Sequence, residues 1–267
     1  MRVGPMPELP DVETLARALR RSTTGRRIHG VRILSPGTIR SPSPQTFGRL
    51  LRGRRIVRVG RRGKYLLIDL DGALTLIVHL RMTGDLALAP AGAPLHPHTR
   101  VLFALDGEEL RFTDQRRFGH MDLLPAARVH RLSGLRRLGA EPLDRGFTVN
   151  RFRALLRGRR GMLKALLLRQ DLVAGIGNLY ADEILFRARL RPARAVESLR
   201  PPEVTRLHAA IRGVLRKATD GLARSGSPAA PFLDARERGG ACPRCGRPLV
   251  AARIAGRGTY YCRACQR

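Results

Sequence analysis

The chain has 267 residues and a formal net charge of +30 at pH 7. This length can bury a core and predicts two domains, and the charge predicts a polyanion as the partner. We expect no membrane partner and a cytoplasmic location, because no apolar run approaches the roughly 20 residues of a spanning helix and no signal-peptide core follows the first residues. A composition bias towards arginine is the alternative explanation of the charge, since only Lys64, Lys164 and Lys217 are lysines.

Residues 6–13 read Met-Pro-Glu-Leu-Pro-Asp-Val-Glu, and a helical apolar spacing follows over residues 11–23. A proline at a chain start carries a secondary amine that can attack a sugar carbon and form an iminium. Pro7 follows Met6 and five further residues, so its nitrogen in the full chain is an unreactive amide. We expect translation to begin at Met6 and this methionine to be removed, which leaves Glu8 as a neighbouring acid. A proline-rich helix entry is the alternative.

Short apolar runs separated by turn dipeptides extend from residue 28 to residue 112 and predict an antiparallel β-sandwich or barrel. One hairpin is expected over residues 65–80, with Asp71-Gly72 at its turn, and another over residues 101–112, with Asp106-Gly107. The proline-rich residues 89–99 are interpreted as a loop excursion. Its two histidines lack acidic or cysteine neighbours, so solvent exposure is favoured over metal binding.

Two further loops carry apolar side chains near arginines. Phe118 lies between arginines and a glycine, and Arg116 precedes it by two positions. In a protein that binds DNA, an apolar wedge beside an arginine can fill the gap left by an extruded base. Met82 lies on another loop and can serve the same purpose, although a plain turn and a core methionine are the alternative interpretations.

Residues 125–147 are interpreted as an interdomain connection, after which helical apolar spacing predominates, as over residues 203–218. Between the helices, residues 171–181 contain Gly175 and Gly177 and lead into Asn178. The pattern matches neither a dinucleotide fingerprint nor a phosphate loop. It predicts a tight turn into a helix whose first amides, with Asn178, hold a backbone phosphate; a glycine-rich helix connection is the alternative.

The cysteines give the strongest pattern in the chain. Two Cys-x-x-Cys pairs, Cys242 with Cys245 and Cys262 with Cys265, are separated by sixteen residues, which is a four-thiolate zinc spacing. Four protein ligands leave no open position, so one structural zinc ion is expected. Two disulfides are the alternative. Between the pairs, Arg257 is expected near a hairpin tip that presents arginine to nucleic acid.

From Met6 to its last residue the chain resembles the formamidopyrimidine-DNA glycosylase family. The resemblance rests on Pro7-Glu8-Leu9-Pro10, Lys64, Met82-Thr83-Gly84 and residues 114–119, 138–143, 175–181 and 262–266. It implies an α+β multidomain fold: an N-terminal β-sandwich with a flanking helix, a helix-two-turn-helix domain and a C-terminal four-cysteine zinc finger. The expected divisions are residues 1–6 (an extension absent from the mature protein), 7–132 (catalytic β-sandwich), 133–147 (linker), 148–238 (helix-two-turn-helix) and 239–267 (zinc finger).

The resemblance also implies an activity and residue roles. It implies a bifunctional DNA glycosylase and abasic-site lyase of base excision repair that removes oxidised purines through a Schiff base on Pro7, followed by β- and δ-elimination. Glu8 is then the general acid and base. Lys64, Asn178 and Arg257 hold phosphates around the lesion, and Met82, Arg116 and Phe118 fill the vacated stack. The expected partner is duplex DNA with oxidised bases or abasic sites, bound by a monomeric bacterial protein at the nucleoid.

Two alternatives to this function stay open. Leu9 favours the purine-repairing branch over an endonuclease VIII-like enzyme for oxidised pyrimidines or hydantoins, but residues 219–241 are shorter than the family's usual segment over 8-oxoguanine. Formamidopyrimidines, hydantoins or abasic sites are then the favoured substrates. The second alternative is a non-catalytic reader of damaged DNA, which the blocked nitrogen of Pro7 favours.

Overall fold

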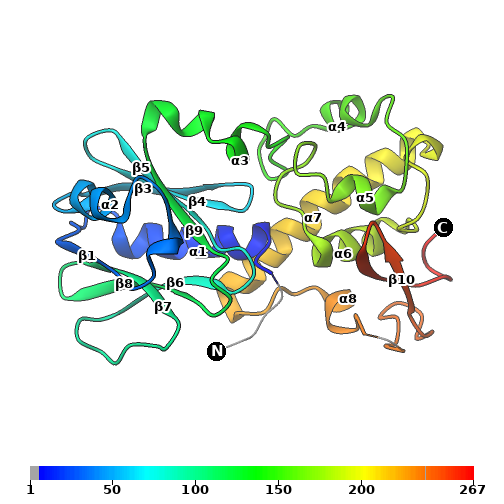
Figure 1. Ribbon diagram of the computed structural model, residues 1–267. Coiled ribbons are helices and arrows are strands. Elements are labelled where there is room, and N and C mark those ends of the chain that lie inside the picture. The colour runs from blue at the N-terminus through cyan, green and yellow to red at the C-terminus, as the bar shows by residue number, and fades with distance from the viewer. Residues whose placement is uncertain (1–5, 238) are drawn as a thin grey trace. The chain divides into compact units, whose positions relative to one another are not determined.

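The computed structural model describes residues 6–237 and 239–267, and the chain divides into two compact units (Figure 1). Among the described residues, the first unit consists of Met6, Pro7 and Asp11–Arg136, whereas the second consists of Glu8–Pro10 and the chain from Arg137 onward. Helix α1 (Leu9–Thr23) therefore begins in the second unit and continues in the first. Of the expected extension over residues 1–6, residues 1–5 lie outside the described residues.

The first unit contains two β-sheets, as the β-sandwich prediction requires. The five-stranded sheet has the order β2 (Ile39–Ser41), β9 (His120–Pro125), β5 (Leu74–His79), β4 (Tyr65–Leu70), β3 (Ile56–Arg62). The four-stranded sheet has the order β1 (Gly30–Ile33), β7 (Thr99–Ala104), β8 (Glu108–Asp114), β6 (Gly84–Pro90). Strands of both sheets share one apolar core with α1 and α2 (Pro44–Leu51). Short helices complete the unit: η1 (Pro36–Thr38), η2 (Ala126–Arg131) and α3 (Ser133–Arg136).

Both predicted hairpins are confirmed. Strands β4 and β5 pair antiparallel from Tyr65 opposite His79 to Leu70 opposite Leu74, and β7 pairs antiparallel with β8. On β4, alternate residues are buried, because one face of the strand packs on the core. The register matters for the site, since it places the residue after Lys64 directly across from His79.

The loop expected over residues 89–99 is shorter in the structure. Ala89 and Pro90 still belong to β6, opposite Glu109 and Glu108, and β6 lies at the edge of its sheet. A proline is compatible with an edge strand because no neighbour needs its missing N–H group on the outer side. Of the two loop histidines, His96 is exposed as predicted, whereas His98 is half-buried.

The second unit is mainly helical. It contains α4 (Val149–Leu156), α5 (Leu163–Leu167), α6 (Asn178–Ala188), η3 (Val196–Ser198), α7 (Pro201–Ser225), α8 (Pro231–Asp234) and the hairpin of β10 (Val250–Ile254) with β11 (Arg257–Tyr261). The apolar stripe predicted along residues 203–218 is buried in the core of this unit. No helix in the described part of the chain has both the length and the apolarity that crossing a membrane requires.

Helix α7 is longer than the sequence pattern predicted, because it continues from Ala218 to Ser225. Thr219 is fully buried, and its hydroxyl donates to the carbonyl of Leu215 at 2.8 Å. Gly226 ends the helix in the left-handed conformation, with φ of 67°. The segment over residues 219–241 thus begins as helix and not as loop.

Candidate active site and metal centre

The carboxylate of Glu8 is bound at the start of helix α6. Glu8 is 2% exposed, and it accepts hydrogen bonds from the backbone amides of Gly177 at 2.7 Å, Leu179 at 2.9 Å and Tyr180 at 3.3 Å. These amides are among the donors that a helix leaves unpaired at its first turn, and the positive end of the helix dipole favours an anion there. Glu8 is therefore held in one position as a carboxylate.

Two glycines make room for this segment. A Cβ atom on Gly177 would lie 2.3 Å from Cδ of Glu8, and one on Gly175 would lie 2.6 Å from Cδ1 of Leu9. Gly175 also has φ of +89°, which favours glycine. The backbone amide of Leu9 donates to the carbonyl of Gly175 at 3.0 Å. Glu8 and Leu9 thus lie against the glycine motif, although the two segments are far apart in sequence.

This arrangement corrects one prediction. The first amides of α6 were expected to hold a backbone phosphate, but three of them bind the carboxylate of Glu8 instead. Asn178 is half-buried at the start of α6, and its side-chain amide donates to the carbonyl of Gly258 at 3.1 Å. The prediction missed the carboxylate because nothing in the local sequence shows that a residue near position 8 folds against this turn.

Three side chains donate hydrogen bonds to the carbonyl of Gly258. Besides Asn178, it accepts from Nζ of Lys164 at 3.1 Å and from Nη2 of Arg236 at 2.9 Å. Lys164 also donates to Oγ1 of Thr259 at 2.8 Å. Gly258 follows Arg257 on strand β11, so this network fixes the backbone that carries Arg257.

Lys164 forms a fully buried ion pair. Its Nζ lies 2.7 Å from Oδ1 of Asp182, and both side chains are 0% exposed. Burial lowers the pKa of the Lys164 ammonium and raises the pKa of the Asp182 carboxyl. Arg236 adds a second cation, with Nε 2.8 Å from Oδ2 of Asp182. Sequence reasoning missed this lysine as a site residue, although a lysine in so arginine-rich a chain was a usable signal.

Arg257 is exposed next to the turn between β10 and β11, as the sequence predicted. Strand β10 ends at Ile254, directly opposite Arg257 in the register. Ala255 and Gly256 form the turn, both with positive φ. The hairpin therefore presents a cationic side chain to the surroundings while its own backbone is held from below by Lys164, Arg236 and Asn178.

In the first unit, a cationic region surrounds the turn that carries Lys64. The ring of Tyr65 lies edge-on to the ring of His79, with 4.5 Å between centroids, and His79 stacks on His120 at 5.4 Å. Burial, followed by the nearby Arg81, lowers the pKa of His79 to about 3. Burial and the charge of Arg40 lower the pKa of His120 to about 4. The cations Arg40, Arg81 and Lys64 near these rings favour an anionic ligand, and His79 is a candidate site residue that the sequence did not indicate.

The loops of Met82 and Phe118 are joined by one buried carboxylate. Asp114 is 1% exposed; it accepts from the hydroxyl of Thr83, from the amide of Arg116 at 3.2 Å and from the amide of Gly119 at 2.7 Å. The amide of Arg116 also donates to Oγ1 of Thr83 at 3.1 Å. Asp114 thus ties the turn after β5 to the turn after β8.

The side chains on these two turns differ in exposure. Phe118 is 52% exposed, which is unusual for a large apolar residue, and the guanidinium of Arg116 lies 4.9 Å from the centre of its ring. Met82 is half-buried on the neighbouring turn. The structure therefore brings together the loops that carry Met82, Arg116 and Phe118, and it leaves the ring of Phe118 and the side chain of Arg116 exposed.

The four cysteines gather as predicted. Their sulfur atoms all lie within 4.8 Å of one another, with 3.9 Å between Cys242 and Cys265 and 3.6 Å between Cys245 and Cys262. A tetrahedral zinc ion with Zn–S bonds of about 2.3 Å requires sulfur separations of about 3.8 Å. The set therefore fits a structural zinc ion, which supplies cross-linking and no open coordination position.

Comparison with known protein families gives three matches along the chain. Residues 6–121 match the formamidopyrimidine-DNA glycosylase N-terminal domain, and residues 138–227 match the H2TH domain of the same enzyme. Residues 239–267 match the zinc finger found in FPG and IleRS. The third match covers the cysteine cluster, which agrees with its assignment to zinc.

Whole-chain relatives point the same way. The formamidopyrimidine-DNA glycosylase of Moorella thermoacetica is 47% identical over 93% of this chain and 95% of its own length. The formamidopyrimidine-DNA glycosylase of Desulforamulus reducens is 43% identical over 98% of this chain and 99% of its own length. A crystal structure of the Lactococcus lactis enzyme, noncovalently bound to DNA with an abasic site, superposes with a TM-score of 0.89 at 33% identity over 97% of this chain and 99% of that chain.

The fold, the zinc site and these matches define a DNA glycosylase of base excision repair with a structural zinc finger. The chain belongs to the formamidopyrimidine-DNA glycosylase family, whose members are glycosylases with an associated abasic-site lyase activity. The family resemblance stated from the sequence is therefore confirmed.

Proposed function

We propose that Pro7, once it is the first residue, is the nucleophile and that Glu8 moves protons beside it. The amine of Pro7 forms a bond to C1′ as the bond from C1′ to the base breaks, and the base leaves with the electron pair and takes up a proton. Loss of the amine proton and opening of the sugar ring at O4′, which gains a proton, leave an iminium between C1′ and Pro7. The observation that carries the proposal is the fixed carboxylate of Glu8, directly next to Pro7 in the chain.

The same iminium accounts for strand cleavage. It acidifies the proton on C2′, whose removal expels the 3′ phosphate with the electron pair of the C3′–O bond. A second elimination, after loss of the proton on C4′, expels the 5′ phosphate. Glu8 is suited to the proton transfers because an acid or base acts efficiently only within hydrogen-bonding reach of the reacting atoms, and Pro7 brings the sugar to its neighbour.

We assign phosphate binding to Lys64, Asn178 and Arg257 and filling of the vacated base stack to Met82, Arg116 and Phe118. The exposed Arg257 on a braced hairpin supports the first assignment. The exposed ring of Phe118 beside Arg116, on turns joined by Asp114, supports the second. We also propose that the protein acts as a monomer in the cytoplasm, at the nucleoid when bound to DNA, with divisions near residues 132, 147 and 238.

Oxidised purines are the proposed main substrates. The Lactococcus lactis relative has been crystallised with DNA containing Fapy-dG, and separately with DNA containing an oxidised pyrimidine. A panel of duplexes, each with one lesion, ranks the substrates of the present chain. We expect formamidopyrimidine to be excised fastest; a clear preference for oxidised pyrimidines would favour the endonuclease VIII-like alternative.

The proposal is tested by comparing two forms of the protein, one starting at Met1 and one starting at Pro7 after removal of Met6. Each is incubated with oxidised duplex DNA and borohydride, which reduces the iminium to a stable adduct. We expect the adduct only with the form that starts at Pro7. Glu8→Gln in that form should slow base excision by about 10²–10⁴-fold. Equal trapping by both forms would exclude Pro7 as the nucleophile.

A further inference from the structure

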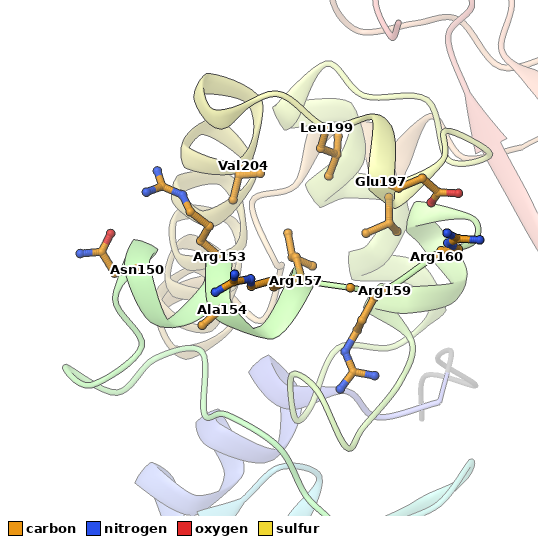
Figure 2. A pocket seen from close by; sticks show the side chains of 12 residues that line it. Asn150, Arg153, Ala154, Arg157, Arg159, Arg160, Glu197, Leu199 and Val204 are labelled. Atoms are coloured by element: carbon orange, nitrogen blue, oxygen red, sulfur yellow. The ribbon is translucent and has the colours of Figure 1, made fainter.

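A pocket in the second unit lies on elements that carry none of the proposed catalytic residues. It has a volume of about 870 Å³ and is bounded by α4, the loop that follows it, η3 and the start of α7 (Figure 2). Its floor is apolar and is formed by Leu156, Val196, Leu199 and Val204. This size and lining are typical of sites that take an apolar group of a ligand.

The rim of the pocket is cationic. Arg153, Arg157 and Arg160 lie along α4 and the following loop, across the pocket from Leu199 and Val204 (Figure 2). Within residues 6–237 and 239–267, no hydrogen bond or ion pair engages the guanidinium group of any of these three arginines. Arg153 and Arg157 are also one helical turn apart, a spacing at which like charges repel. The rim therefore has a surplus of positive charge that the unit itself does not balance.

The walls of the pocket are fixed by backbone hydrogen bonds. The amide of Val196 donates to the carbonyl of Gly161 at 2.8 Å, and the amide of Arg159 donates to the carbonyl of Leu156 at 3.1 Å. The one carboxylate in the lining, on Glu197, accepts from the amide of Gly161 at 3.2 Å. The pocket thus exists before any ligand binds, and a preformed site loses less entropy on binding.

We propose that this pocket docks an acidic segment of a partner protein, one in which aspartate or glutamate residues flank a bulky apolar side chain. The apolar side chain enters the floor and the carboxylates pair with the arginine rim, as charged rims and apolar centres do at protein interfaces. A second copy of this chain is disfavoured by its net charge of +30. A DNA backbone matches the rim but offers nothing apolar for the floor.

The test uses a fluorescein-labelled peptide with aspartates on both sides of a Leu-Phe pair, titrated with the full-length protein. We expect Arg153→Ser with Arg157→Ser to weaken peptide binding by about tenfold or more, a change readily resolved by anisotropy. Arg216→Ser with Arg224→Ser removes the same charge from the exposed face of α7 and should leave binding within about twofold. Leu199→Gln should also weaken binding, since it makes the floor polar.

Three results would overturn the proposal. The control pair could weaken binding as much as the pocket pair, or a peptide with serine in place of Leu-Phe could bind equally well; either result means that only net charge matters. In the third, a duplex with an abasic-site analogue would displace the peptide, which makes the pocket part of the DNA footprint. Excision by the pocket variants should match the unsubstituted protein, so this test does not depend on the assignment of Pro7.

Discussion

The two units hold their candidate site residues in opposite ways. In the second unit, Glu8, Lys164 and Asp182 are buried, and each is bonded to several partners. In the first unit, Arg116 and Phe118 are exposed, and the buried Asp114 fixes only the turns that carry them. A group that moves protons must be placed within hydrogen-bonding reach, whereas a ring that enters a base stack must be free to leave its own surface. The difference in burial agrees with the different tasks proposed for Glu8 and for Phe118.

Removal of zinc should have the largest effect on structure and on DNA binding. The structural change should be confined to the second unit. The apolar cluster around the cysteines is small and includes Phe186, Phe232 and Leu249. Zinc binding stabilises comparable finger peptides by about 10–16 kcal/mol, so a chelator should unfold residues 239–267 and release the backbone of Arg257. We expect hydrogen exchange to rise in this segment and affinity for DNA to fall. Unchanged affinity would contradict the role given to the finger.

Replacement of the buried lysine tests whether the second unit depends on its charge network. Lys164→Met leaves Asp182 with one cation fewer inside the unit, and breaking a buried ion pair costs about 3–5 kcal/mol. Lys217→Met, at an exposed position on α7, is the matched control and should change stability by less than about 0.5 kcal/mol. Denaturant unfolding measures both. Similar stabilities of the two variants would show that the network is not needed for folding.

Removal of one acceptor oxygen from Asp114, whose carboxylate joins the turns of Met82 and Phe118, should lower the stability by a smaller amount. Asp114→Asn replaces one acceptor oxygen by an NH2 group, which faces the backbone N–H group of either Arg116 or Gly119, because the two groups bind different oxygens of Asp114. An unsatisfied buried donor costs about 1–3 kcal/mol. Discrimination between bases opposite the lesion should also decline, because Met82, Arg116 and Phe118 are no longer aligned. Asp85→Asn, at an exposed position on β6, serves as the control. If Asp114→Asn leaves the discrimination between opposite bases unchanged, the hydrogen bonds of Asp114 have no role in reading the opposite base.

Changes in pH should affect the two units in opposite directions. Burial raises the pKa of Glu183 in the second unit to about 7 from its ordinary 4.5, so its contribution to stability is complete below about 4.5 and is lost as pH rises through about 7. Burial lowers the pKa of His79 in the first unit to about 3 from 6.5, so its contribution is complete above about 6.5 and is lost as pH falls towards about 3.

Unfolding measured across this pH range checks both contributions. Glu183→Gln should flatten the stability profile on the alkaline side, and His79→Gln should flatten it on the acidic side. We expect these changes in slope to be the smallest of the effects predicted for zinc removal, Lys164, Asp114 and pH, because many other groups titrate over the same pH interval. Profiles that keep their slopes after either substitution would show that other groups govern the pH dependence.

The sequence predicted the parts of the molecule that depend on local chemistry. The turns at Gly72 and Gly107 followed from dipeptides that favour positive φ, and the cysteine spacing predicted the cluster because both pairs lie on short turns. The extension of α7 to Ser225 was missed because its last turns are polar on the exposed side.

Long-range contacts could not be predicted in the same way. Glu8 and the amide of Gly177 are separated by 169 positions in the chain, and no periodicity reports such a pairing. Lys164 was missed for a related reason, since its partners Asp182 and Gly258 come from a later helix and from the last hairpin. The family resemblance named Glu8 and Asn178 but did not show that Glu8 itself occupies the backbone amides next to Asn178.

The most direct test of the central claim is to identify the residue that becomes bonded to the sugar. The form that starts at Pro7 is trapped with borohydride on duplex DNA containing an oxidised purine, digested and analysed by mass spectrometry. We predict that the reduced sugar remnant lies on the nitrogen of Pro7, in the first peptide of this form. A remnant on Lys64, Lys164 or Lys217, or no remnant with an active preparation, would contradict it.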